Sequence, residues 1–253
     1  MPASIKLQQE YGEDLAVLFV ESQNSGAEKT ERFIMKQRWF GNPAMWTNEQ
    51  PFSTGSGGLP NFALLSADGK VLAKGNHVSK KTRELIEDEI RGAKGAPEGT
   101  PKQFKKAWGY FAKDSLAKAI AAAEKVGAKE EFSTAAAETI DEFTKRTSAR
   151  LERIEWCLEN GFSAQASDKL KDLLKAVKGA GELEEMALAV EERMEGDELK
   201  VELEASEALE KALAKLYADG RDAKLFAKVG KLAEKYPGTK AAERAEHIAT
   251  LKM

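Results

Sequence analysis

The side chains that most often carry chemistry are scarce in this chain of 253 residues. Cys157 is the only cysteine, and His77 and His247 are the only histidines. A single cysteine excludes a disulfide within the chain and a thiolate metal cluster, and two histidines do not make a histidine-rich metal site. The segment Gly55-Ser-Gly-Gly58 lacks the Gly-Lys-Ser/Thr ending of a phosphate-binding loop. We therefore expect neither a metal nor a cofactor.

The composition is that of a folded protein with a well-hydrated surface. Hydrophobic residues make up 42% and charged residues 32%. The 39 basic and 42 acidic side chains nearly cancel, so the net charge of -3 gives no electrostatic reason to bind nucleic acid. No apolar run approaches the roughly 20 residues that span a bilayer, so we expect no membrane insertion.

Proline and glycine divide the sequence into two parts. Six of the seven prolines lie at or before Pro101, and none occurs from 102 to 236. The segment Gly95-Ala-Pro-Glu-Gly-Thr-Pro101 breaks regular structure on both sides. We predict a first domain over 1–95, a linker over 96–101 and a second domain over 102–253.

The first part has the pattern of an α/β domain. The apolar run 15–20 predicts a strand buried on both faces, and a helix is expected over 27–37. Two short strands are predicted at 61–65 and 70–74, joined by a tight turn that contains Gly69. A further helix is expected over 79–94, with Ser79 as its N-cap.

The second part is predicted to be helical throughout. Apolar residues recur there with helical spacing, as at Phe104, Ala107, Trp108 and Phe111, and glycines stand near the ends of these stripes. We expect seven or eight helices in a helical bundle or a helical-hairpin stack. The segment Lys235-Tyr-Pro-Gly-Thr239 resembles the proline-closed hairpins of tetratricopeptide repeats.

Two features of this helical part have simple interpretations. Cys157 lies on an apolar stripe with Leu151, Ile154 and Leu158, as expected for an inert core residue. The acidic stretch 182–204 is interpreted as a solvated helical face.

The order of elements in the first part resembles the thioredoxin fold, and specifically the TlpA/ResA type of exported bacterial thioredoxins. The resemblance covers roughly residues 5–94. It depends on Ser22-Gln-Asn-Ser25, which follows the first strand, and on the segment from Gly58-Leu-Pro60 to Gly75. It implies an α/β thioredoxin-like N-terminal domain joined to an all-α C-terminal domain.

The resemblance also implies a site. Ser22 and Ser25 match the positions of the family's Cys-x-x-Cys pair, and hydroxyls cannot perform dithiol exchange. The family's peptide groove would remain, with Pro60 at the cis-proline position and Leu59 before it. Trp46 and Glu21 are further candidates for this groove, although a core aromatic and a solvated carboxylate are simpler interpretations of them.

These observations predict a redox-inactive thioredoxin-fold protein that acts as a protein-interaction or scaffold module, with a protein or an extended peptide as its partner. The alternative is a thiol-dependent enzyme. That enzyme would be an oxidoreductase whose cysteines are replaced by serine here, or a glutathione-transferase-like protein in which Ser22 stabilises the thiolate. The resemblance implies a periplasmic location if a signal peptide has been removed, and a cytoplasmic one otherwise. Oligomeric state and partner identity stay open.

Overall fold

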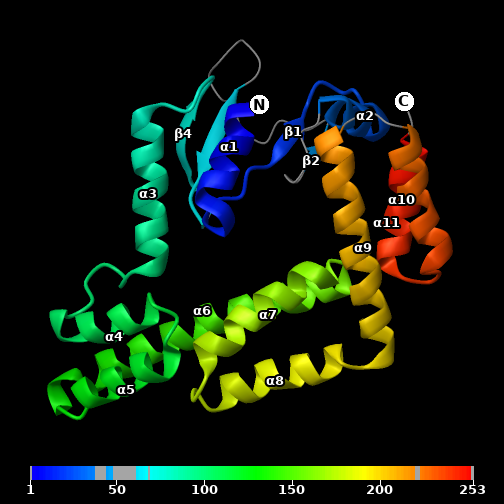
Figure 1. Ribbon diagram of the computed structural model, residues 1–253. Coiled ribbons are helices and arrows are strands. Elements are labelled where there is room, and N and C mark those ends of the chain that lie inside the picture. The colour runs from blue at the N-terminus through cyan, green and yellow to red at the C-terminus, as the bar shows by residue number, and fades with distance from the viewer. Residues whose placement is uncertain (1, 38–43, 48–60, 68, 220–222, 252–253) are drawn as a thin grey trace. The chain divides into compact units, whose positions relative to one another are not determined.

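A computed structural model describes residues 2–37, 44–47, 61–67, 69–219 and 223–251 (Figure 1). These residues are mainly helical. The chain divides between Ala93 and Lys94 into two compact units, which are described separately. None of the helices described combines the length and the apolar character that crossing a bilayer requires.

The described part of the first unit contains three helices and four short strands. Its strands form two separate two-stranded sheets, one parallel and one antiparallel. The parallel sheet consists of β1 (Phe19–Glu21) and β2 (Ala44–Trp46), and the antiparallel sheet of β3 (Phe62–Leu65) and β4 (Val71–Gly75). The helices are α1 (Pro2–Tyr11), α2 (Ala27–Gln37) and α3 (Lys80–Lys94), with a 3₁₀ turn η1 (Gly12–Asp14).

Several local predictions for this unit are confirmed. Helix α2 has the bounds expected from the sequence. Strands β3 and β4 form the expected hairpin, closed by a hydrogen bond from the Ser66 amide to the Lys70 carbonyl at 2.9 Å. Ser79 caps α3, because its hydroxyl accepts a hydrogen bond from the Thr82 amide at 3.1 Å.

The prediction of a thioredoxin-like α/β domain is wrong. Only the last residues of the run 15–20 join a strand, and that strand pairs with β2 alone within the described residues. Leu18 and Val20 are about half exposed, at 48% and 51%, whereas a central strand would bury both faces. The hairpin β3–β4 belongs to a different sheet. The protein is therefore predominantly all-α, with two small sheets in its described residues.

Helix α1, which no sequence pattern predicted, is tied to α3 by polar contacts. Arg83 donates to both carboxylate oxygens of Glu10, at 2.7 and 2.8 Å. The Tyr11 hydroxyl donates to Glu87 at 3.3 Å. Partial desolvation, with the neighbouring Glu87 carboxylate, raises the pKa of Tyr11. These contacts join residues more than seventy positions apart, so sequence patterns could not show them.

The second unit is helical throughout its described residues. It contains eight α-helices and two 3₁₀ turns there, and consecutive helices pack against one another. Their bounds are η2 (Lys102–Phe104), α4 (Lys105–Phe111), α5 (Leu116–Gly127), η3 (Glu130–Phe132), α6 (Ser133–Glu159), α7 (Ser163–Val177), α8 (Glu182–Met194), α9 (Asp197–Asp219), α10 (Ala223–Lys235) and α11 (Lys240–Thr250).

The predicted apolar stripes of this unit form its core. Phe104, Trp108, Leu173 and Val190 are buried in one cluster that extends from η2 to α8. Cys157 belongs to the same cluster and is completely buried. A second set of buried side chains belongs to α9–α11, with Leu209, Leu213, Leu216, Phe226, Val229 and Ala245.

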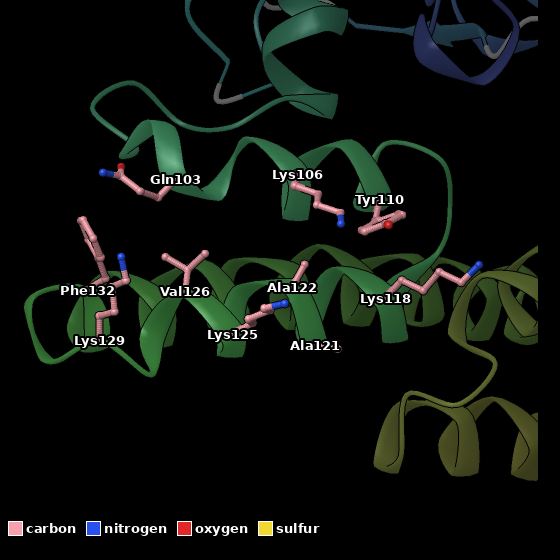
Figure 2. A pocket seen from close by; sticks show the side chains of 10 residues that line it. All are labelled: Gln103, Lys106, Tyr110, Lys118, Ala121, Ala122, Lys125, Val126, Lys129 and Phe132. Carbon is pink, nitrogen blue, oxygen red and sulfur yellow. The ribbon is translucent and has the colours of Figure 1, made fainter.

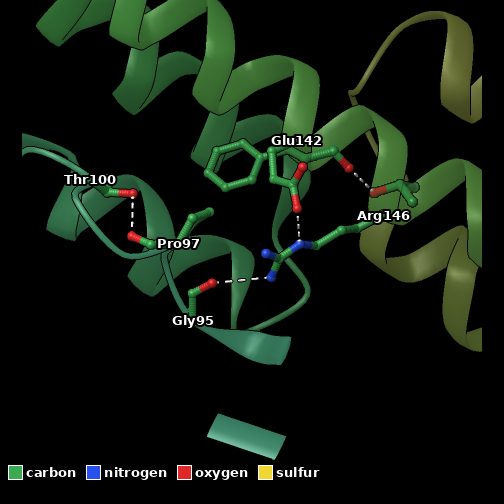
Figure 3. A network of polar contacts seen from close by, with 7 residues as sticks. Gly95, Pro97, Thr100, Glu142 and Arg146 are labelled. Atoms are coloured by element: carbon green, nitrogen blue, oxygen red, sulfur yellow. Dashed lines mark hydrogen bonds and ion pairs between the residues drawn. The ribbon is translucent and has the colours of Figure 1, made fainter. Parts of the chain in front are cut away.

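Arg146 of α6 holds the segment before η2 in place (Figure 3). Its Nη1 donates to the carbonyl of Gly95 at 3.1 Å, and its Nε donates to Glu142 at 2.7 Å. The guanidinium also lies 5.0 Å from the ring centroid of Trp108, within the range of a cation–π contact. The residue just before the expected linker is thus held, through its backbone carbonyl, to the longest of the described helices.

Helix α9 carries two buried polar residues that cap other helices. The Glu202 carboxylate accepts hydrogen bonds from the amides of Lys240 and Ala241 at 2.7 and 3.0 Å. One turn later, the Ser206 hydroxyl accepts from the Ala164 amide in the first turn of α7, at 3.2 Å. The sequence interpretation of 182–204 as a solvated face is therefore wrong at Glu202, whose residue is only 8% exposed.

These caps matter because the first amides of a helix have no partner within it. At the start of α11, Glu202 binds the first two amides, and the Thr239 hydroxyl accepts from the third, Ala242, at 3.0 Å. A carboxylate at this end also interacts favourably with the helix dipole.

The end of α6 lies against the start of α11. Gly161 has φ +73°, and a Cβ added there would lie 2.5 Å from Cβ of Lys240. The Lys240 ammonium donates to the carbonyl of Glu159, and Arg244 donates to the carbonyl of Gly161 at 2.9 Å. Terminal carbonyls of α6 are thus satisfied by cationic side chains of α11.

Replacing Glu202 by alanine should lower the free energy of unfolding of the helical unit by about 1–3 kcal/mol, because two amides at the start of α11, one of them buried, lose their acceptor. Glu202→Gln keeps an acceptor oxygen without the charge and should lose less. Chemical denaturation followed by circular dichroism measures both, with Glu204→Ala, an exposed neighbour on α9, as the control. Equal stability of Glu202→Ala and this control would contradict the capping role.

Gly161→Ala should destabilise the same unit by about 1–3 kcal/mol, because its backbone conformation and the contact with Lys240 both oppose a side chain. Gly109→Ala is the matched control. Gly109 lies within α4 with open space around it, so alanine there should be neutral or stabilising. Denaturation curves in which the two alanine variants coincide would show that the close approach is unimportant.

Candidate protein-binding groove

A groove of about 550 Å³ lies between α4 and α5 in the second unit (Figure 2). It has a half-buried apolar floor and an exposed lysine rim. Four of its lining residues are lysines, and no aspartate or glutamate is among the described residues that line it. The lining consists of Gln103, Lys106, Tyr110, Lys118, Ala121, Ala122, Lys125, Val126, Lys129 and Phe132.

Helix α5 contributes one complete face to this groove. Lys118, Ala121, Ala122 and Lys125 follow the i, i+3, i+4, i+7 pattern, so they share one side of the helix. The opposite side carries Leu116, Ala119 and Ala123, which are buried. Alanines at the centre of the groove face leave room for another chain to approach α5 closely.

The rest of the lining comes from α4, the two 3₁₀ turns, Val126 near the end of α5 and Lys129 just before η3. Lys106 and Tyr110 project from α4 on the side that faces α5 (Figure 2). The Lys106 ammonium lies 5.7 Å from the Tyr110 ring centroid. At the other end, the Phe132 ring meets Phe104 edge to face, with centroids 6.4 Å apart. Phe132 is therefore held against the core as a half-buried side chain.

The hairpin that forms the groove is anchored to α6. Asp114, in the turn between α4 and α5, accepts from Arg150 at 2.7 Å. At the other end of α5, a Cβ on Gly127 would lie only 2.5 Å from Cβ of Ala136, so the two backbones approach closely there. Both ends of α5 are thereby positioned on a long helix, which makes the groove a preformed feature.

The lysines of the groove are available to a ligand. Lys118, Lys125 and Lys129 are exposed, and none of them forms an ion pair within the described part of the chain. Like charges along one face repel each other mildly, and an anionic ligand would relieve that repulsion. The arrangement can attract negative charge at its rim and bury apolar groups on its floor.

The residues proposed from the sequence lie in the first unit, and the structure brings some of them together. Glu21 pairs with Trp46 across β1 and β2. The Glu21 carboxylate accepts from the amides of Gln23 and Ser25, at 2.7 and 3.1 Å, and from the Ser25 hydroxyl at 3.1 Å. Glu21 therefore organises the turn before α2.

The other candidates of that site are placed differently. Ser22 is exposed, and Trp46 is 37% exposed. Leu59 and Pro60 lie outside the described residues, so their expected role stays a prediction. The described strands form two separate two-stranded sheets and no single central sheet, so the reason for assigning Ser22 and Ser25 to a redox loop no longer holds.

Sequence reasoning missed the groove. The available signal was the lysine and alanine pattern from Lys118 to Lys129, which has helical spacing. The net charge of the chain does not indicate this local group of lysines, because basic and acidic residues nearly cancel over the whole sequence. The position of α4 opposite this face depends on the turn at Asp114. The spacing of apolar residues does not predict that turn.

The described residues contain no group of three or more histidine, cysteine, aspartate or glutamate side chains that could hold a metal ion. The groove and the helical packing around it are therefore the main functional evidence in the second unit. Comparison of the chain with models of known protein families, with curated proteins and with solved structures finds no match.

Proposed function

We propose that the protein is a protein-interaction module whose helical unit binds an acidic, partly apolar segment of a partner in the groove between α4 and α5. The observation that carries this proposal is a lysine rim around an apolar floor. Glutamates or aspartates of the partner would meet Lys118 and Lys125, and its apolar side chains would cover Val126 and Phe132.

The floor favours a protein segment over a nucleic acid. Nucleic acids are held mainly through their phosphates, and arginine is prominent in such interfaces. Here the rim has lysines and no arginine among the described lining residues. The half-buried Tyr110, Val126 and Phe132 instead suit leucine or methionine side chains, as in grooves that bind an amphipathic helix.

The length of the lysine stripe favours an extended or helical segment over a compact ligand. Lys118 and Lys125 are seven residues apart on α5, which is about 10 Å along the helix axis. A partner helix presents its own side chains with the same rise per residue, so it can meet both lysines at once.

The enzymatic alternatives have less support. Cys157 is completely buried in the core, away from any thiol substrate. The glutathione-transferase analogy required a thioredoxin-like first domain, whereas the described strands of the first unit form two separate two-stranded sheets.

Reversal of two groove charges should weaken binding of an acidic peptide. The probe is a fluorescein-labelled helical peptide with glutamates and leucines on one face, measured by fluorescence anisotropy. Lys118→Glu/Lys125→Glu should raise its Kd about tenfold or more, because two attractive pairs of up to about 1 kcal/mol each become repulsive. Added salt should weaken binding to the wild-type chain.

The matched control is Lys228→Glu/Lys231→Glu, which makes the same charge change on exposed residues of α10. Its Kd should equal that of the wild-type chain once the change in net charge is screened by salt. An equal loss of peptide affinity in both variants would mean that only the overall charge of the chain matters. Tighter binding of a labelled oligonucleotide than of the peptide would assign the groove to nucleic acid. Either result overturns the proposal.

A further inference from the structure

The outward side of α8 is acidic and partly apolar. Its inner side, with Leu183, Ala187, Val190 and Met194, is buried in the core. Met186 and Leu188 are exposed at 44% and 46%, and glutamates surround them in the sequence. Met186 and Leu188 lie two residues apart, so they point to different sides of α8, and only Leu188 belongs to the face that also carries Glu185 and Glu192.

The outward face of α8 repeats the pattern of the groove face with the opposite charge. Glu185, Leu188, Ala189 and Glu192 are exposed and occupy positions i, i+3, i+4 and i+7. Lys118, Ala121, Ala122 and Lys125 occupy the same positions on α5. Each helix therefore presents two like charges about 10 Å apart with small or apolar residues between them.

The outward face of α8 and the groove face of α5 are complementary in charge and in side-chain size. Glutamates of α8 match lysines of α5 in spacing, and Leu188 would face the small side chains of Ala121 and Ala122. Neither Glu185 nor Glu192 forms an ion pair within the described part of the chain, so both are available.

We propose that the acidic segment bound by the groove is α8 of a second copy of this chain. This inference rests on the proposed function of the groove and names its partner. Groove and α8 are different surfaces, so the contact is head-to-tail, and an open chain keeps one free groove at one end and one free α8 at the other unless a ring closes. The protein would then form rings or chains whose length increases with concentration.

Mixing two charge-reversed variants tests this assignment. Lys118→Glu/Lys125→Glu carries negative charge at positions 118 and 125 of α5 and keeps the negative charges of Glu185 and Glu192, whereas Glu185→Lys/Glu192→Lys carries positive charge at both pairs of positions. Each variant alone should associate at least about tenfold more weakly than the wild-type chain, because both its surfaces carry the same charge. An equimolar mixture should recover association, since each groove then meets an α8 of opposite charge. Sedimentation velocity over a concentration series at low salt measures all three.

A control separates this contact from general attraction between oppositely altered chains. Glu234→Lys/Glu246→Lys makes the same charge change on exposed residues of α10 and α11. In the control this change is combined with Lys118→Glu/Lys125→Glu, so that no unaltered groove remains, and a mixture with the chain that carries Lys118→Glu/Lys125→Glu alone should not recover association. Recovery equal to that of the α8 variant would overturn the inference.

The outcome for the self-assembly and the outcome for the groove are distinguishable. A wild-type chain that stays monomeric up to about 1 mM at low salt, in the range of very weak complexes, overturns self-assembly. If the same chain still binds the acidic peptide, the groove keeps its proposed function with another partner. All variants alter exposed side chains, and circular dichroism spectra that match the wild type verify that they fold.

Discussion

The helical unit depends on satisfying the backbone groups at the ends of its helices. Every helix leaves unpaired amides at its start and unpaired carbonyls at its end, and burying them without partners is costly. Helix α9 supplies partners for two such starts, through Glu202 for α11 and Ser206 for α7. Helix α11 in turn supplies Arg244 for the end of α6. The helices are thus connected at their ends as well as along their apolar stripes.

The surface that results has separated charges although the chain is nearly neutral. Because α4, α5 and α8 direct their apolar residues inward, their charged residues collect on the outer faces. On α5 these charges are lysines beside a groove, and on α8 they are glutamates beside exposed apolar side chains. A near-zero net charge therefore does not describe what the protein presents to a partner.

The first unit shows how correct local predictions can lead to a wrong fold. Helix α2, the hairpin β3–β4 and the cap at Ser79 all form as expected. The error lay in joining the strands into one sheet. Strand pairing links segments that are distant in sequence, and the short β1 binds only β2 in the described residues. The apolar run before it indicated a buried strand, yet Leu18 and Val20 are exposed.

Helical periodicity is a local property, so the apolar pattern was enough to predict which segments of the second unit are helical and which of their faces are buried. It also determined that Cys157 lies on a core stripe. The folded chain alone reveals that Glu202 is a buried cap, that α4 faces the lysines of α5, and that the described strands of the first unit do not form one central sheet. Each of these results depends on contacts between residues far apart in the chain, whose energies no local pattern contains.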